Sequence, residues 1–134
     1  MRALVRLSLG CLAAGAFAAG CDSPTTPTTP TLPAIVTFAV AEETFRVELT
    51  TQAQLDAARA ARDGAGPQIP NGRIVAGTGV NTGWSWHLEN VAFADATIEL
   101  CDGRPSDVER EGPSYGGGRY CPWGAVIVAI GAPS

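Results

Sequence analysis

Four prolines recur at every third position of the segment CDSPTTPTTPTLP, which spans residues 21–33. Because polyproline II has three residues per turn, these prolines would lie along one edge of an extended rod. At ~3.1 Å per residue, such a rod would hold the rest of the chain roughly 35–40 Å from its point of attachment. We therefore expect residues 21–33 to be a stalk and residues 34–134 to form a single globular domain.

The segment before the stalk, residues 1–20, has the features of an export signal. Arg2 and Arg6 give it a basic start. The apolar run at residues 7–18 is too short for a membrane-spanning helix, which needs ~20 apolar residues. We expect this segment to be removed from the mature protein.

The residues around Cys21 resemble the cleavage site of bacterial lipoproteins. The small residues Ala18-Ala19-Gly20 precede the cysteine, although that pattern prefers Leu at the position of Ala18. We expect Cys21 to carry a lipid, which would hold the protein at a membrane of a bacterial cell envelope. The alternative is an ordinary signal peptide cleaved nearby, which would leave Cys21 as a free thiol.

The cysteine count suggests a disulfide. With Cys11 in the signal and Cys21 as lipid acceptor, only Cys101 and Cys121 remain in the domain. An exported chain with two cysteines left most simply pairs them. Two reduced thiols are an alternative. A metal site is another, but it would need further ligands from a chain with one histidine.

Composition argues against two classes of function. All nine basic residues are Arg, and the formal net charge of −4 becomes −6 (7 − 13) once Arg2 and Arg6 leave with the signal. An acidic chain without Lys is poorly suited to bind nucleic acid through its phosphates. The length also leaves no room for separate cofactor and substrate domains.

Hydrophobic periodicity predicts a strand followed by a helix. Residues 44–50 alternate, with Phe45, Val47 and Leu49 on one face. Thr51 and Gln54 then form a capping-box pattern that opens a helix through Arg62, and Asp63-Gly64 ends it. We expect Leu55, Ala58 and Arg62 to share the buried face of this helix.

The rest of the chain has mainly strand patterns. We expect turns at residues 64–72, a short strand at 73–76, an alternating strand at 84–88 and another strand at about 94–101. Residues 125–130 form a continuous β-branched run, which is typical of a strand buried on both faces. Together these patterns predict an α+β domain with a mainly antiparallel sheet and one helix.

The loop between Cys101 and Cys121 combines charged residues with the glycine run 116–118. We expect it to be too polar and glycine-rich to contribute to the core. A disulfide that closes it would make it either a structural staple or a presented binding surface.

Catalytic signals are weak. His87 is the single histidine, and on a strand it would lie beside Ser85 and Glu89. A nucleophilic triad needs such groups in contact, but no nucleophile-elbow motif surrounds them. A surface histidine with a structural role is the favoured interpretation. A small hydrolase using His87 with Glu89 or Asp102 is the alternative.

Acidic residues cluster in and near the loop. Asp102, Asp107 and Glu109 could offer oxygen ligands to Ca²⁺, although their spacing is not that of an EF-hand. A solvated acidic surface is the favoured interpretation. Trp84, Trp86 and Trp123 could likewise form a core or a platform for a peptide or carbohydrate, and the core is favoured.

Several blocks of the sequence are unusual when taken together: FRVELT, IPNGRIVAGTG, NTGWSWHLENV, ATIELCDGRPSDVE and RYCPWGAVIV. They resemble the N-terminal domain of a slime-mould-type calmodulin-binding protein of about seventy-four kilodaltons, which also occurs alone in exported bacterial proteins. The resemblance spans about residues 44–130. It implies the identity of the domain and a link between Cys101 and Cys121, but no established activity. Calmodulin binding is not carried over, because its targets are basic amphipathic helices and QAQLDAARAAR has almost no bulky apolar face.

The sequence therefore predicts a monomeric, membrane-tethered, non-enzymatic binding or inhibitor-like module without a cofactor. Its partner would be an unknown protein or glycan and not a nucleic acid. A purely structural envelope protein is a further alternative. We assign no catalytic residue. The candidate binding surface comprises Trp84, Trp86, His87, Asp102, Arg104, Asp107, Glu109, Tyr115 and Trp123.

Overall fold

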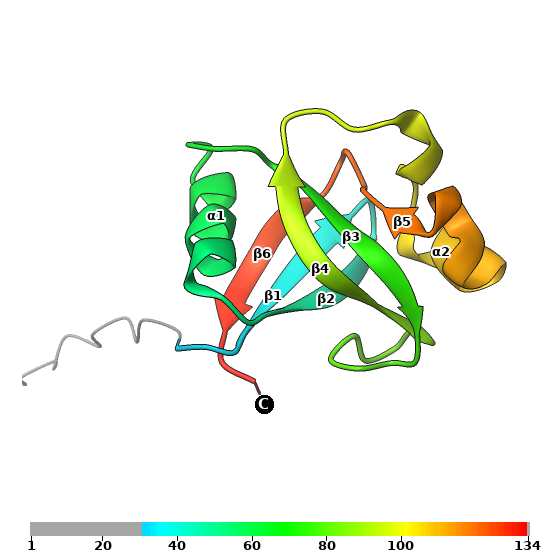
Figure 1. The fold of residues 1–134 in the computed structure, drawn as a ribbon, viewed down its shortest axis with the longest axis horizontal. Coiled ribbons are helices and arrows are strands. Elements are labelled where there is room, and N and C mark those ends of the chain that lie inside the picture. The colour runs from blue at the N-terminus through cyan, green and yellow to red at the C-terminus, as the bar shows by residue number, and fades with distance from the viewer. Residues whose placement is uncertain (1–30, 134) are drawn as a thin grey trace, which may run out of the picture.

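Two three-stranded antiparallel sheets form the domain (Figure 1). The computed structural model describes residues 31–133, so the expected signal, Cys21 and most of the stalk lie outside the described residues. The first sheet has the order β2-β1-β6, with β1 at Ala34–Val40, β2 at Glu43–Leu49 and β6 at Val126–Gly131. The second has the order β4-β3-β5, with β3 at Ile69–Ala76, β4 at Trp86–Ala94 and β5 at Arg119–Tyr120.

The β1–β2 hairpin supplies much of the core. The alternation expected in β2 is confirmed, because Phe45, Val47 and Leu49 are buried. Phe38 of β1 lies opposite Phe45 in the register, and the two rings stack with centroids 5.0 Å apart. The sequence interpretation had not identified β1, which is the central strand of this sheet.

The predicted helix is confirmed as α1 (Gln52–Arg62). Thr51 and Gln54 form the expected capping box, and Gly64 follows the helix with a positive φ of 68°. One detail was wrong: Ala61, not Arg62, joins the buried face, and Arg62 is exposed. In Figure 1 this helix stands at one side of the two sheets, beside β6.

The second sheet differs from its expected pattern in two places. β3 starts at Ile69, inside the segment expected to consist of turns. In β4 the register shifts opposite Gly72, where Asn90 has a positive φ of 52°. This bulge makes Val91 the next buried residue after Leu88, so strict alternation does not continue along the strand.

Two strand predictions near the C-terminal half were wrong. Residues 95–98 are not a strand, and the 3₁₀ turn η1 (Glu99–Cys101) follows them. β6 exists, but it is an edge strand rather than one buried on both faces, and Val126 and Val128 are 61% and 57% exposed. A continuous apolar run does not distinguish these two positions in a sheet.

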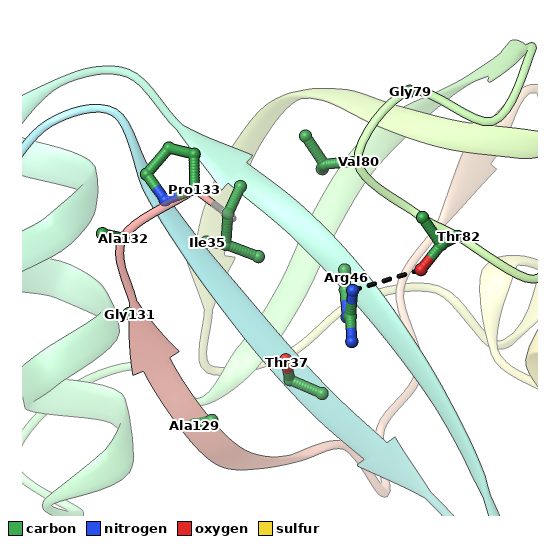
Figure 2. A pocket seen from close by; sticks show the side chains of 10 residues that line it. All are labelled: Ile35, Thr37, Arg46, Gly79, Val80, Thr82, Ala129, Gly131, Ala132 and Pro133. Atoms are coloured by element: carbon green, nitrogen blue, oxygen red, sulfur yellow. Dashed lines mark hydrogen bonds between the residues drawn. The ribbon is translucent and has the colours of Figure 1, made fainter.

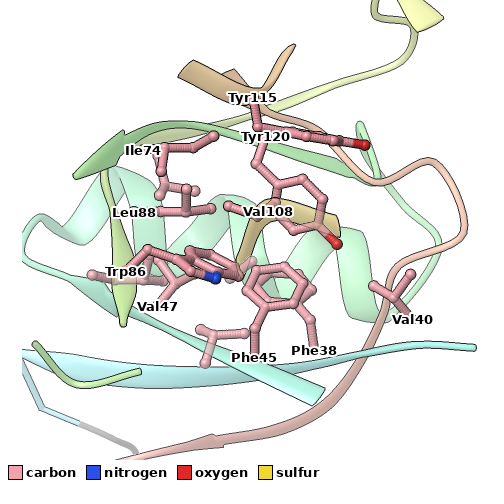
Figure 3. Packing of buried hydrophobic residues seen from close by; sticks show 14 residues of the cluster. Phe38, Val40, Phe45, Val47, Ile74, Trp86, Leu88, Val108, Tyr115 and Tyr120 are labelled. Carbon is pink, nitrogen blue, oxygen red and sulfur yellow. The ribbon is translucent and has the colours of Figure 1, made fainter. Parts of the chain in front are cut away.

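The segment 101–121 contributes to the core, contrary to expectation. It contains helix α2 (Pro105–Glu111), the irregular 3₁₀ segment η2 (Gly112–Gly117) and β5. Its Val108, Tyr115 and Tyr120 point into the cluster around Phe45 and Trp86 (Figure 3). Two antiparallel sheets with two helices confirm the α+β class. Within residues 31–133, no helix is long and apolar enough to cross a membrane.

Candidate functional site

Cys101 and Cys121 form a disulfide, as predicted, with their Cα atoms 5.1 Å apart. The Cys121 N–H also donates to the Cys101 carbonyl, at 2.8 Å. The bond therefore ties residues 97–102 firmly beside residues 121–123. These two short segments carry the most exposed apolar side chains near the loop.

Trp123 lies on this surface, where 44% of it is exposed. Its backbone N–H donates to Asp102 Oδ1 at 2.8 Å, and its indole Nε1 donates to Thr97 Oγ1 at 2.5 Å. The two bonds fix both the backbone and the ring. This large apolar group is thus held in one orientation although solvent surrounds almost half of it.

Two aliphatic residues accompany Trp123. Ile98 and Leu100 are 65% and 67% exposed, on the segment that runs into η1. We call Ile98, Leu100 and Trp123 the apex surface. The sequence interpretation had selected Trp123 but neither aliphatic residue, because it expected a strand there.

The three carboxylates considered for Ca²⁺ have separate structural partners. Asp102 accepts from Trp123 N, Asp107 accepts from Arg104 N at 3.0 Å, and Glu109 accepts from Ser85 N at 2.9 Å. Among residues 31–133, no group of three or more His, Cys, Asp or Glu side chains could hold a metal ion. Each carboxylate instead satisfies a backbone N–H.

Asp107 also stabilises the start of α2. The backbone N–H of Arg104 and then the guanidinium of Arg110, 2.8 Å away, hold the pKa of Asp107 below its ordinary value. Arg104 itself is exposed, at the N-cap of the helix. The expected site residues of this segment therefore serve mainly to build it.

The two tyrosines of the loop are buried. The Tyr115 hydroxyl donates to the Asp102 carbonyl, and the Tyr120 hydroxyl donates to the Gly103 carbonyl at 3.0 Å. Burial raises the pKa of both phenols, and the carboxylate of Asp107 adds to the shift at Tyr115. Tyr115 thus belongs to the core and not to the proposed binding surface.

Trp84 and Trp86 likewise do not form an open platform. Trp86 is buried against Phe45 and Tyr120. Trp84 is half-buried, and its indole Nε1 donates to the Thr44 carbonyl at 2.8 Å. The favoured interpretation of this pair as core is confirmed for Trp86, whereas Trp84 closes the edge of β2.

His87 lies beside Glu89, as the strand pattern predicted. Its Nδ1 is 2.6 Å from the Gly77 carbonyl and must carry the hydrogen, because a carbonyl only accepts. Its Nε2 is 3.6 Å from Glu89 Oε1, and Glu89 also pairs with Arg73. No hydroxyl or thiol within residues 31–133 is hydrogen-bonded to His87, so these residues assemble no nucleophilic triad.

A groove that the sequence did not reveal lies on the outer face of the first sheet (Figure 2). It has a volume of about 390 Å³ and lies between the loop 77–83 and the segment that follows β6. A second cavity of about 330 Å³, which includes His87 and Glu89, shares Gly79 and Val80 with it. Nothing in the local sequence predicts either cavity, because both require the loop to be placed against β2.

The comparisons with known proteins bear on the identity of the domain. The family model for the N-terminal domain of the seventy-four-kilodalton calmodulin-binding protein matches residues 32–133. No curated protein and no solved structure matches the chain at a significant level. The match covers both sheets, both helices and the disulfide, and it confirms the resemblance that the sequence blocks indicated. The chain belongs to the family of this N-terminal domain.

Proposed function

We propose that this protein is an exported, lipid-anchored, non-enzymatic binding module that captures a protein partner at its apex surface. One observation carries the proposal. Trp123 is exposed but is fixed by two hydrogen bonds, beside the exposed Ile98 and Leu100. Rigid aromatic anchors with apolar neighbours are typical of protein–protein hot spots, because little side-chain entropy is lost on binding.

The chemistry of the apex surface favours a protein over a glycan. Ile98 and Leu100 have no side-chain polar group for a sugar hydroxyl, and the Trp123 N–H already bonds to Thr97. Asp95 and Glu99 are exposed beside the aliphatic residues, and neither forms an ion pair within residues 31–133. The partner should therefore offer an apolar pocket with a basic rim.

The tethering part of the proposal is supported by the sequence. The basic start, the short apolar run and the small residues before Cys21 suit an exported lipoprotein. The proline-rich stalk would then hold the domain roughly 35–40 Å from the lipid anchor. Mass spectrometry of the protein purified from membranes tests this point, because a lipid at Cys21 adds its mass to the mature N-terminus. An unmodified N-terminus would contradict it.

Quantitative capture with matched variants tests the binding site. The full chain would be used as bait in an envelope extract, beside Trp123→Ser, Leu100→Ser and the control Val128→Ser. Val128 is an exposed aliphatic residue of β6, away from the disulfide. We expect one captured protein to decrease roughly tenfold with the two apex variants and to remain with the control. Equal capture by all four baits would refute the proposal.

A further inference from the structure

The loop 77–83 is held in a fixed position against the first sheet. The side chain of Asn81 is fully buried, its Oδ1 accepts from Arg46 N at 2.8 Å, and its Nδ2 donates to the Trp86 carbonyl at 3.0 Å. The Gly77 carbonyl is held by His87. Burying an amide is costly unless it is hydrogen-bonded. The loop is therefore a built wall and not a loosely packed connection.

This wall bounds one side of the groove on the outer sheet face (Figure 2). Ile35 of β1 and Ala129 of β6 lie on the face below, and Val80 projects from the loop above them. Pro133 lies on the opposite side, in the segment after β6. The volume of about 390 Å³ falls within the range of small-molecule sites. The groove is thus a largely apolar space, open to solvent, with preformed walls.

One charge lies in the groove, and it is positive. The Arg46 Nη1 donates to Thr82 Oγ1 at 3.1 Å, which orients the guanidinium (Figure 2). Arg46 forms no ion pair with another residue of 31–133, and no Asp or Glu lines the groove. A guanidinium has five N–H donors in a planar fork that matches a carboxylate. Most of these donors have no described partner.

We propose that this groove binds a small apolar carboxylate, with the carboxylate on Arg46 and the aliphatic part against Ile35, Val80 and Ala129. The hydroxyls of Thr37 and Thr82 lie in the same groove and can donate to the carboxylate. Two sources share this chemistry, a short fatty acid and the C-terminus of an apolar peptide. The site is distinct from the apex surface, and the proposal does not depend on that function.

Titration followed by methyl NMR tests the proposal. The full chain in lipid nanodiscs would be titrated with hexanoate and hexanamide, and with acetyl-Val-Val-Leu as the free acid and as the amide, against empty nanodiscs as blank. We expect saturable shifts in the methyl signals of Ile35, Val80 and Ala129, with each acid binding roughly tenfold more tightly than its amide. The tighter of the two acids identifies the source.

Two variants and a control complete the test. Arg46→Gln removes the charge but keeps the backbone N–H that bonds to Asn81, so the fold is retained, and Ala129→Phe fills the groove from an exposed position. Both should weaken acid binding roughly tenfold. Arg73→Gln, which changes an exposed strand arginine of the other sheet, should leave it unchanged. Equal binding of acid and amide, an unaltered affinity in Arg46→Gln, or no saturable shift at millimolar ligand would each overturn the proposal.

Discussion

The fully buried side chain of Asn81 accepts a hydrogen bond from the backbone N–H of Arg46, 2.8 Å away. Arg46 lies in β2, an edge strand, so this N–H has no neighbouring strand to bond on its outer side. Trp84 closes the same edge at the Thr44 carbonyl. The amide of Asn81 also bonds to Trp86 of β4, so one side chain joins the two sheets.

Replacing Asn81 by Leu should be strongly destabilising. The substitution keeps the approximate size of the side chain but leaves the Arg46 N–H and the Trp86 carbonyl without their partner. We expect the free energy of unfolding in urea to fall by about 3 kcal/mol. Asn71→Leu is the control, because Asn71 is only half-buried and bonds to Arg119 of β5, and it should cost about 1 kcal/mol. Equal losses would show that Asn81 does not hold the loop.

Glu43 should stabilise the disulfide loop from a distance in sequence. Its carboxylate, at the β1–β2 hairpin, accepts from Ser106 N at 2.9 Å and from Ser106 Oγ at 2.7 Å, at the start of α2. Glu43→Gln should lower the free energy of unfolding by about 1–2 kcal/mol, because a neutral amide replaces a charged acceptor. The exposed neighbour Glu42 provides the control variant Glu42→Gln, and a loss as large there would argue against the contact.

The buried tyrosines predict a loss of stability at high pH. Because their folded pKa values are raised, Tyr115 and Tyr120 stay protonated in the folded state while the unfolded chain begins to lose these protons near pH 10. Their contribution is complete below about pH 10 and falls above it, by about 1.4 kcal/mol per pH unit for each tyrosine. Urea unfolding between pH 9 and 11 measures this slope, which Tyr120→Phe should reduce by about half. An unchanged slope in that variant would exclude Tyr120 as the cause.

Calcium should not stabilise the domain. Asp102, Asp107 and Glu109 each accept a backbone N–H from a different residue, so they do not converge on one ion. A site of ~10 μM affinity at a hundredfold excess would raise Tm by roughly 10–20 °C. We expect no shift in a thermal melt with millimolar Ca²⁺. A rise that a chelator reverses, and that Asp107→Asn abolishes, would show the opposite.

Local signals predicted the first half of the fold well. The alternation at Phe45, Val47 and Leu49 and the capping box at Thr51 depend on neighbouring residues alone. The helix α2 also had such a signal, since Pro105 suits the first helical position and Asp107 the first turn, but the charge and glycine content of the loop obscured it.

The remaining differences depend on tertiary packing. β6 has the composition of a buried strand, and only its place at the sheet edge leaves Val126 and Val128 exposed. The bulge at Asn90 changes which β4 residues face the core. The groove exists because Asn81 draws its loop onto β2, and Ile98 and Leu100 are exposed because no strand forms there. None of these positions follows from periodicity.

The most direct test of the proposed function is site-specific photocross-linking in cells. A benzophenone side chain would replace Leu100 in the apex surface or, in a second strain, Val128 on β6. Both positions are more than half exposed, so each probe is available to a neighbouring protein. We predict one discrete cross-linked product from position 100 that is absent from position 128 and lost when Trp123→Ser is combined with the probe. The same products from both positions, or none from position 100, would contradict a protein partner at the apex surface.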